Sequence, residues 1–257
     1  MELAQTLKPS ISKLTRLFVA LFIVVVQQVA TFGVVWSEKF AQEAHKEFLL
    51  ARTNFHQHSN NAEFAWKFGR AAFDEGEFVK TDAEREKVAL EAIAACRKAV
   101  EISPANAAAH YYLAMNLGQL ARTKTLGALK LVKEMEKEFK RSAELDKQFD
   151  YAGATRSLGI LYLEAPGWPT SIGNKAKARE YLMAALKLAP NYPENHLSLM
   201  EAFAKWGEKD LLREGLLQYK KMMTAALEEF KGAEWEDSWA DWNERYKSLL
   251  SQSAAPE

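Results

Sequence analysis

Apolar and polar residues in the middle of the chain alternate with the period of an α-helix, most plainly over residues 175–207. There Ala178, Leu182 and Ala185 recur at steps of four and three residues, which places them on one helical face. The two alanines allow a second helix to approach closely, while the leucine fills the contact. The first helix should end before Pro190, because proline cannot continue a helix. The pattern predicts two packed helices with a short break between them.

The same order of a small, a large and a small residue occurs twice upstream, each time followed by a stop and a second helix. The two further triplets are Ala92, Cys96, Ala99 and Met135, Phe139, Ser142. The stops at Pro104, Lys147 and Pro190 stand 43 residues apart, twice in succession. Residues 61–230 therefore resemble the tetratricopeptide (TPR) repeat, whose unit is ~34 residues long. The resemblance implies an all-α, right-handed α-solenoid of about four helix pairs, with the surplus residues as long inter-helix insertions.

The N-terminal residues 1–37 read as a membrane anchor or a signal peptide. Residues 17–36 are twenty residues whose only polar side chains are Gln27, Gln28 and Thr31, long enough for a transmembrane helix. Basic residues before this segment predict a cytoplasmic N-terminus and an exported remainder, in a periplasmic or other extracytoplasmic space. The alternative is a cleaved signal peptide with its cleavage site at residues 35–37.

Two further segments flank the repeats, which we assign to residues 61–232. Residues 38–60 predict a linker helix. His56 and His58 stand beside the polar capping cluster at residues 59–61, so we expect them at an exposed loop and not at a metal site, which would need both imidazoles to converge. Residues 233–257 carry an aromatic stripe that predicts a helix covering the end of the solenoid. The alternative for this stripe is a free surface that docks a partner or a membrane.

Residues 163–174 interrupt the third helix pair with two prolines and two glycines, which exclude regular structure. Trp168 and Ile172 indicate that this loop is pinned to something apolar. It is then a shaped loop on the rim of the solenoid and a candidate contact for a ligand or partner. In the alternative, Trp168 fills the core between repeats. Candidate binding residues in this loop and in the first helices of the second and third pairs are Trp168, Ile172, Arg156, Tyr162, Tyr111, Tyr112 and Asn116.

The segment around this loop resembles a second, narrower family. The residues that carry the resemblance are Gly153, Arg156, Leu158, Gly159, Tyr162, Ala165 to Pro169, Ile172, Gly173, Lys175, Ala176, Leu188 and Pro190. They are similar to the TPR-like lipoproteins called TatT, periplasmic companions of TRAP transporters. That resemblance implies a groove for an apolar or organic-acid ligand and association with a solute-binding subunit, although the lipidation cysteine of the family is missing. The long inter-helix insertions are also similar to those of the regulator of microtubule dynamics family, another membrane-tethered TPR-like group, which implies a eukaryotic organelle or cytoplasmic setting.

Composition narrows the choice of function. Lysine plus arginine equal aspartate plus glutamate at 34 each, so no basic field is available for nucleic acid. Cys96 is the only cysteine, which excludes an internal disulfide. No nucleophile with a base, zinc motif or phosphate loop is present, and we expect no enzyme and no cofactor. The expected function is that of a membrane-held scaffold that binds protein partners. A further copy of the same chain is one of the partners considered, which would give a homo-oligomer. A TatT-like accessory of a TRAP-type transporter is the alternative.

Overall fold

The computed structural model describes residues 38–124 and 127–254 of the 257-residue chain. Within these ranges the chain forms ten α-helices and one 3-10 helix, with no β-strand. Their bounds are α2 (Glu38–Gln57), α3 (Ala62–Phe78), α4 (Asp82–Ile102), α5 (Ala107–Arg122), α6 (Ala128–Leu145), α7 (Phe149–Glu164), α8 (Lys175–Leu188), α9 (Pro193–Lys205), α10 (Lys209–Glu229), η2 (Ala233–Trp235) and α11 (Glu236–Ala254).

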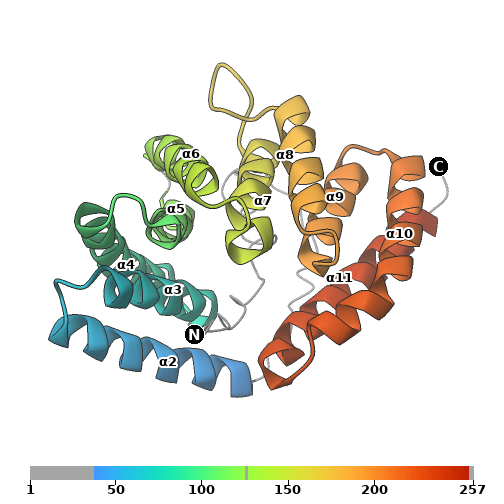
Figure 1. The fold of residues 1–257 in the computed structure, drawn as a ribbon. Helices are drawn as coiled ribbons and strands as arrows, with labels where there is room; N and C mark the ends of the chain where they lie inside the picture. The colour runs from blue at the N-terminus through green and yellow to red at the C-terminus, as the bar shows by residue number, and fades with distance from the viewer. Residues whose placement is uncertain (1–37, 125–126, 255–257) are drawn as a thin grey trace.

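Consecutive helices pack as pairs, namely α3 with α4, α5 with α6, α7 with α8 and α9 with α10. The first helices of the pairs also contact one another in sequence, and the second helix of each pair contacts the first helix of the next pair. The result is a curved array with α2 and α11 at its two ends (Figure 1). The predicted all-α arrangement of four helix pairs is confirmed.

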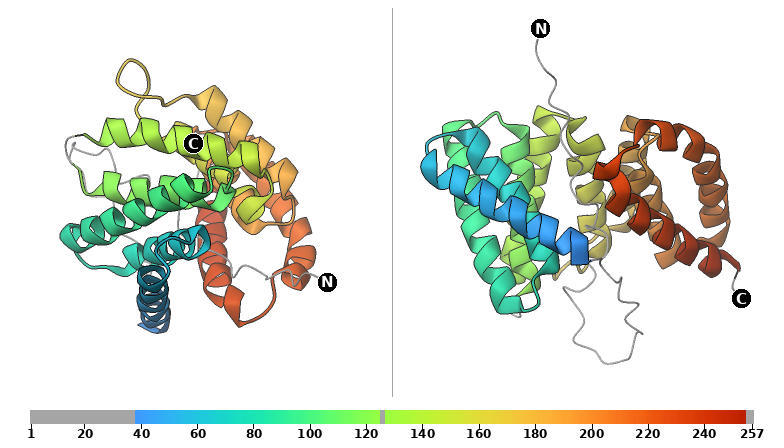
Figure 2. Two further views of the ribbon diagram at one scale, coloured as in Figure 1. Left: turned by 60° about the vertical axis from the view of Figure 1, so that its left-hand side comes forward. Right: turned by 90° about the horizontal axis from the view of Figure 1, so that it is seen from below.

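The two end helices meet on one side of the array. Seen from below, α2 and α11 both lie in front of the paired helices (Figure 2). The Lys39 Nζ atom on α2 lies 3.2 Å from a carboxylate oxygen of Glu236 on α11. Both side chains are largely exposed, so this ion pair contributes little to stability.

The small-large-small triplets lie in the core as predicted. All nine side chains are buried, and those of the middle members, Cys96, Phe139 and Leu182, have no exposed surface. A Cβ atom at Gly69 would lie 2.1 Å from the Cys96 sulfur, and one at Gly159 would lie 2.7 Å from Leu182. Glycine at these two positions therefore lets the paired helices approach closely. Burial also raises the pKa of the Cys96 thiol, which stays protonated.

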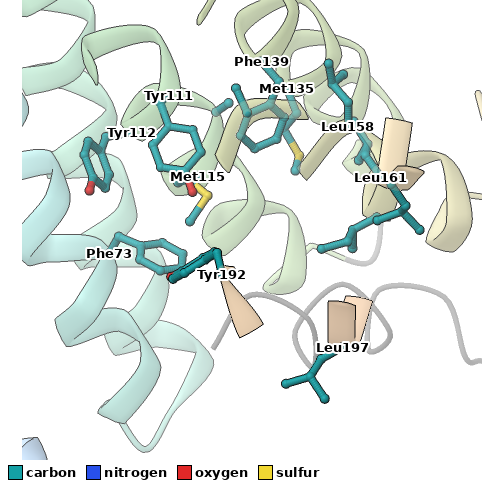
Figure 3. Packing of buried hydrophobic residues seen from close by; sticks show 14 of the residues in the cluster. Phe73, Tyr111, Tyr112, Met115, Met135, Phe139, Leu158, Leu161, Tyr192 and Leu197 are labelled. Carbon is teal, nitrogen blue, oxygen red and sulfur yellow. The ribbon is translucent and has the colours of Figure 1, made fainter. Parts of the chain in front are cut away.

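The aromatic centre of the core lies within the second pair, α5 and α6. Figure 3 shows Tyr111 of α5 between Phe139 of α6 and Tyr112, its neighbour in the chain. The Tyr111 ring centroid lies 5.9 Å from that of Phe139 and 5.1 Å from that of Tyr112. Tyr111 is fully buried. Aromatic packing across α5 and α6 therefore forms the middle of the array.

The predicted long insertions between paired helices are wrong for three of the four pairs. The connections within these pairs are residues 79–81, 123–127 and 206–208, and only the third pair has a long one, residues 165–174. The longer repeat period comes mainly from helix length, since α4 has 21 residues and α6 has 18. The length of a helix depends on the positions of its capping residues and of proline. The spacing of apolar residues does not define these ends, so it did not predict the lengths of α4 and α6.

Two histidines tie repeat turns together at equivalent positions. His110 Nε2 donates to the carbonyl oxygen of Pro104 at 3.1 Å, and His196 Nε2 donates to that of Pro190 at 2.7 Å. The third equivalent position is Gly153, where a Cβ atom would lie 2.9 Å from the Tyr111 hydroxyl. Packing therefore excludes a histidine from the middle repeat. The sequence carried this signal as a histidine six residues after Pro104 and after Pro190, but the proline carbonyl as acceptor was not predicted.

The buried His196 should make folding pH-dependent. Burial lowers the pKa of His196 below 6.5, against the opposing hydrogen bond to Pro190. Below pH 6.5 the unfolded chain then binds more protons than the folded chain, so stability is complete above that pH and falls as the pH decreases. We expect His196→Gln, whose amide can still donate to Pro190, to reduce this acid-side loss in urea unfolding. His58→Gln, at an exposed turn, serves as the control. An unchanged pH slope in His196→Gln would contradict the assignment.

The C-terminal helix covers the last pair, and the alternative of a free aromatic stripe is wrong. Trp242 has no exposed surface, and its indole N–H donates to Glu194 of α9 at 3.1 Å. Trp235 is also buried but belongs to η2 rather than to α11. The aromatic stripe therefore packs against α9 and against Phe230, whose ring lies 4.8 Å from that of Trp235.

A buried ionic cluster fixes α11 on α9. Arg245 contacts three carboxylates, with its nearest nitrogens 2.7 Å from Glu194, 2.7 Å from Glu201 and 3.0 Å from Asp241. The Arg245, Glu194 and Asp241 side chains are at most 3% exposed. Burial and the two neighbouring carboxylates raise the pKa of Glu201, although Arg245 opposes the change. The attachment of α11 thus depends on one guanidinium.

The predicted membrane segment, residues 17–36, lies outside the described residues. In the part of the chain that the structure describes, no helix combines the length and apolar character that a bilayer crossing requires.

Candidate partner-binding site

Residues 165–174, which we call the rim loop, have a shape fixed by their own backbone. The Gly173 N–H donates to the Pro166 carbonyl at 2.8 Å. A Cβ atom at Gly173 would fall 1.9 Å from the Ala165 carbonyl oxygen, so only glycine permits this close approach. Ile172 is half-buried and packs against the main core. The predicted pinning of the loop is confirmed, and Ile172 together with the backbone provides it.

Trp168 does not take part in this pinning. Its side chain is 89% exposed, the largest exposure of any large apolar side chain in the described ranges. The loop projects away from the helices at the edge of the array (Figure 1). The alternative in which Trp168 fills the core is therefore wrong. An indole kept in solvent on a loop of fixed shape leaves a large apolar surface accessible.

Tyr162 holds the base of the rim loop. Its carbonyl oxygen accepts a hydrogen bond of 2.9 Å from the Asn174 N–H. Its hydroxyl donates to Glu136 of α6 at 2.5 Å, and its ring is buried. Burial together with the Glu136 carboxylate raises the pKa of Tyr162 to about 12, so the phenol stays neutral. The Lys177 ammonium lies 4.9 Å from the ring centroid. Tyr162 is therefore a support for the loop that also orients a lysine.

Two further cations follow the rim loop at the start of α8. Arg179 lies 4.8 Å from the centroid of the Trp206 ring and donates to both oxygens of Glu208 at 2.6 and 2.7 Å. Lys175 lies 5.1 Å from the same ring and 2.9 Å from Glu208. These contacts fix α8 against the turn between α9 and α10. The Lys175 side chain, directly after the last residue of the rim loop, remains 54% exposed.

Arg156, another predicted binding residue, lies inside the array. Its guanidinium donates to Asp150 at 3.2 Å and to Asn195 at 3.0 Å, and it lies 5.3 Å from the Tyr192 ring. The side chain is buried, and its Nε atom has no hydrogen-bond partner. Burial raises the pKa of Asp150 despite Arg156 and the hydrogen bond from Tyr111. The cluster joins α5, α7 and α9 and is not displayed to solvent.

The remaining predicted residues are on α5 and are also buried. The Tyr111 hydroxyl donates to Asp150 at 2.7 Å. Asn116 donates to the carbonyls of Gly69 and Tyr112, both at 2.8 Å. Tyr112 itself stacks on Trp66, with ring centroids 5.9 Å apart. Of the seven predicted residues, the structure therefore brings Trp168, Ile172 and Tyr162 together at the rim loop and places the other four in the interior.

The sequence of the N-terminal half carries a family signature. Residues 35–164 match the family described as regulator of microtubule dynamics protein 1-3. This segment is just over half of the chain. The chain belongs to the regulator of microtubule dynamics protein 1-3 family. No curated protein matches it.

The fold of this family member is TPR-like. A thermophilic TPR protein of Thermus thermophilus aligns with a TM-score of 0.59 and 18% identity, over 82% of this chain and 92% of that one. The MamA protein aligns with a TM-score of 0.46 and 18% identity, over 76% of this chain and 93% of that one. The first alignment confirms the TPR-like fold predicted from the repeats.

The matched segment of this regulator of microtubule dynamics family member ends at Glu164, the last residue of α7. The rim loop follows immediately, so its features are described from this chain alone. The sequence pattern singled out Trp168 and Ile172 in this loop but not the cations after it. The signal was present, because Lys175, Lys177 and Arg179 follow the loop at alternate positions. Among the described residues, no group of three or more His, Cys, Asp or Glu side chains is arranged to hold a metal ion.

Proposed function

We propose that this protein is a non-enzymatic scaffold that binds a protein partner at the rim loop, with Trp168 as the apolar contact and Lys175 and Lys177 beside it. The observation that carries the proposal is the 89% exposure of an indole on a loop that the backbone and Ile172 hold in place. Tryptophan is the residue type most enriched at the centres of protein interfaces. Because the loop is already ordered, binding loses little conformational entropy.

We further propose that residues 17–36 hold the chain to a membrane, which their length and apolar composition support. They precede α2, which lies at one end of the array (Figure 1). The family description directs the search for partners to proteins that act on microtubule dynamics. The transporter-accessory role stays a prediction, and Arg156, the cation that an organic acid would use, is bonded to Asp150 and Asn195.

The test is site-specific photocrosslinking in the native host. A photoreactive phenylalanine analogue replaces Trp168 in one strain and Met183, an exposed apolar residue on the adjacent α8, in another. We expect a discrete protein adduct from position 168 and none from position 183. Recovery of the chain from detergent-solubilised membranes with an intact N-terminus checks the anchor in the same preparation. Equal adducts at both positions would contradict the proposed site.

Trp168→Ala should weaken partner binding without affecting the fold. Because the side chain is solvated, we expect a change of less than about 0.5 kcal/mol in the free energy of unfolding. Partner recovery after chemical crosslinking should fall at least about tenfold, the usual effect of losing a central interface tryptophan. Met183→Ala is the matched control. A large loss of stability in Trp168→Ala would instead assign the residue a structural role.

A further inference from the structure

The outward side of α6 carries a row of positive charge. The exposed residues of α6 are Lys130, Lys133, Lys137, Arg141 and, at the C-terminal end, Glu144. The first four follow at steps of three, four and four residues, which places them on one face of the helix. At 1.5 Å of rise per residue the row extends for ~16 Å. We call these four residues the cationic row.

Three of the four glutamates of the same helix contact residues of other helices, and the fourth is the exposed Glu144. Glu134 accepts from Arg97 of α4 at 2.7 Å, and Glu136 accepts from Tyr162 of α7 at 2.5 Å. Glu138 lies 2.5 Å from His110 of α5 and is buried. Burial would raise the pKa of Glu138, but the hydrogen bond and charge of His110 outweigh it and lower the pKa. The acidic side chains of α6 therefore hold the helix in place.

This arrangement leaves the cationic row largely uncompensated. Lys130 and Lys133 form no ion pair with any acidic side chain of the described ranges. Lys137 lies 3.3 Å from the inward-facing Glu138 while its own side chain stays 80% exposed. Among the described residues, Arg141 pairs only with the exposed Glu144, at 3.3 Å. Along α6 an ion pair at four-residue spacing occurs between Lys140 and Glu136, and neither residue belongs to the cationic row.

The position of the row leaves it open to a partner. α6 lies on the outer side of the array, away from α2 and α11 (Figure 1). The chain as a whole has no net charge, so the row is a local asymmetry rather than part of a general basic surface. No large apolar side chain is exposed on α6. A membrane-binding helix needs exposed apolar side chains beside its cations. Because α6 has none, a polar partner is favoured over a membrane.

We propose that the cationic row binds an acidic polypeptide segment, with carboxylates of the partner spaced along α6. The row would steer the encounter and set the register of a bound acidic chain. This surface is independent of the rim loop, because Trp168 is not part of it, and either site can fail without the other.

The test measures binding of a fluorescent polyglutamate peptide to the full chain by anisotropy, with polyglutamine as the neutral reference. The triple variant Lys130→Glu, Lys133→Glu, Lys137→Glu is compared with Lys46→Glu, Lys220→Glu, Lys221→Glu, which changes the net charge equally at exposed sites on α2 and α10. We expect the row variant to weaken binding by roughly tenfold or more, since three attractive contacts with the peptide become repulsive. The control variant should stay within about twofold.

Several results would overturn the proposal. These are no saturable binding of polyglutamate, equal weakening in both triple variants, or tighter binding of anionic phosphatidylserine vesicles or single-stranded DNA of matched charge. Circular dichroism and thermal unfolding establish that both variants are folded. Retained crosslinking at position 168 in the row variant separates the failure of this proposal from the failure of the rim-loop site.

Discussion

Replacing Arg245 by methionine should lower the free energy of unfolding by about 3–5 kcal/mol, the usual effect of removing one partner from a buried ionic cluster. The methionine fills much of the space but leaves Glu194, Glu201 and Asp241 without the guanidinium that α11 supplies. The negative charge is then held in a site of low dielectric constant, which is costly. Urea unfolding followed by circular dichroism measures the loss.

The same variant should respond to pH in a characteristic way. Without the positive charge of Arg245, the buried carboxyl groups bind protons more readily. The pKa of Glu201 is already raised by burial in the wild type. The deficit relative to the wild type should therefore be smaller in mild acid than at neutral pH. Arg213→Met is the control, because Arg213 is exposed on α10 and pairs only with Asp210 of the described residues. A loss below about 1 kcal/mol in Arg245→Met would contradict the assigned role.

Replacing Ala185 by tryptophan should abolish cooperative unfolding of the third helix pair or destabilise the protein by at least about 3 kcal/mol. Ala185 has no exposed surface, and its carbonyl oxygen accepts a hydrogen bond of 3.1 Å from Asn195. An indole at this position would force α8 away from α7 and α9. Thermal unfolding checks the result.

The matched control for this prediction lies two residues away on the same helix. Met183 is 53% exposed, so Met183→Trp adds the same side chain without crowding the core. We expect a change within about 0.5 kcal/mol. Similar losses in the two variants would mean that tryptophan acts through helix propensity rather than through packing.

The candidate site was only partly predictable. Trp168 and Ile172 were recognised because prolines and glycines exclude regular structure around them, which is a local property. The sequence did not predict that Ile172 would pack against the core while Trp168 faces the solvent, since a large apolar side chain in a loop can do either. Tyr162 is buried because Glu136, on a different helix, accepts its hydroxyl. That partner lies 26 residues away, and no short-range pattern links the two.

The sequence by itself determined the helices, their pairing and their buried faces. A helix is specified locally, so the spacing of Ala178, Leu182 and Ala185 and the stop before Pro190 sufficed to predict two packed helices. Only the tertiary structure decided which charges remain free. It turned Glu134, Glu136 and Glu138 of α6 toward other helices, left the cationic row exposed and enclosed Arg245 among three carboxylates. The physical reason is that the energy of a charged side chain depends on its solvent exposure and on partners from other helices, and neither is fixed until the helices are packed.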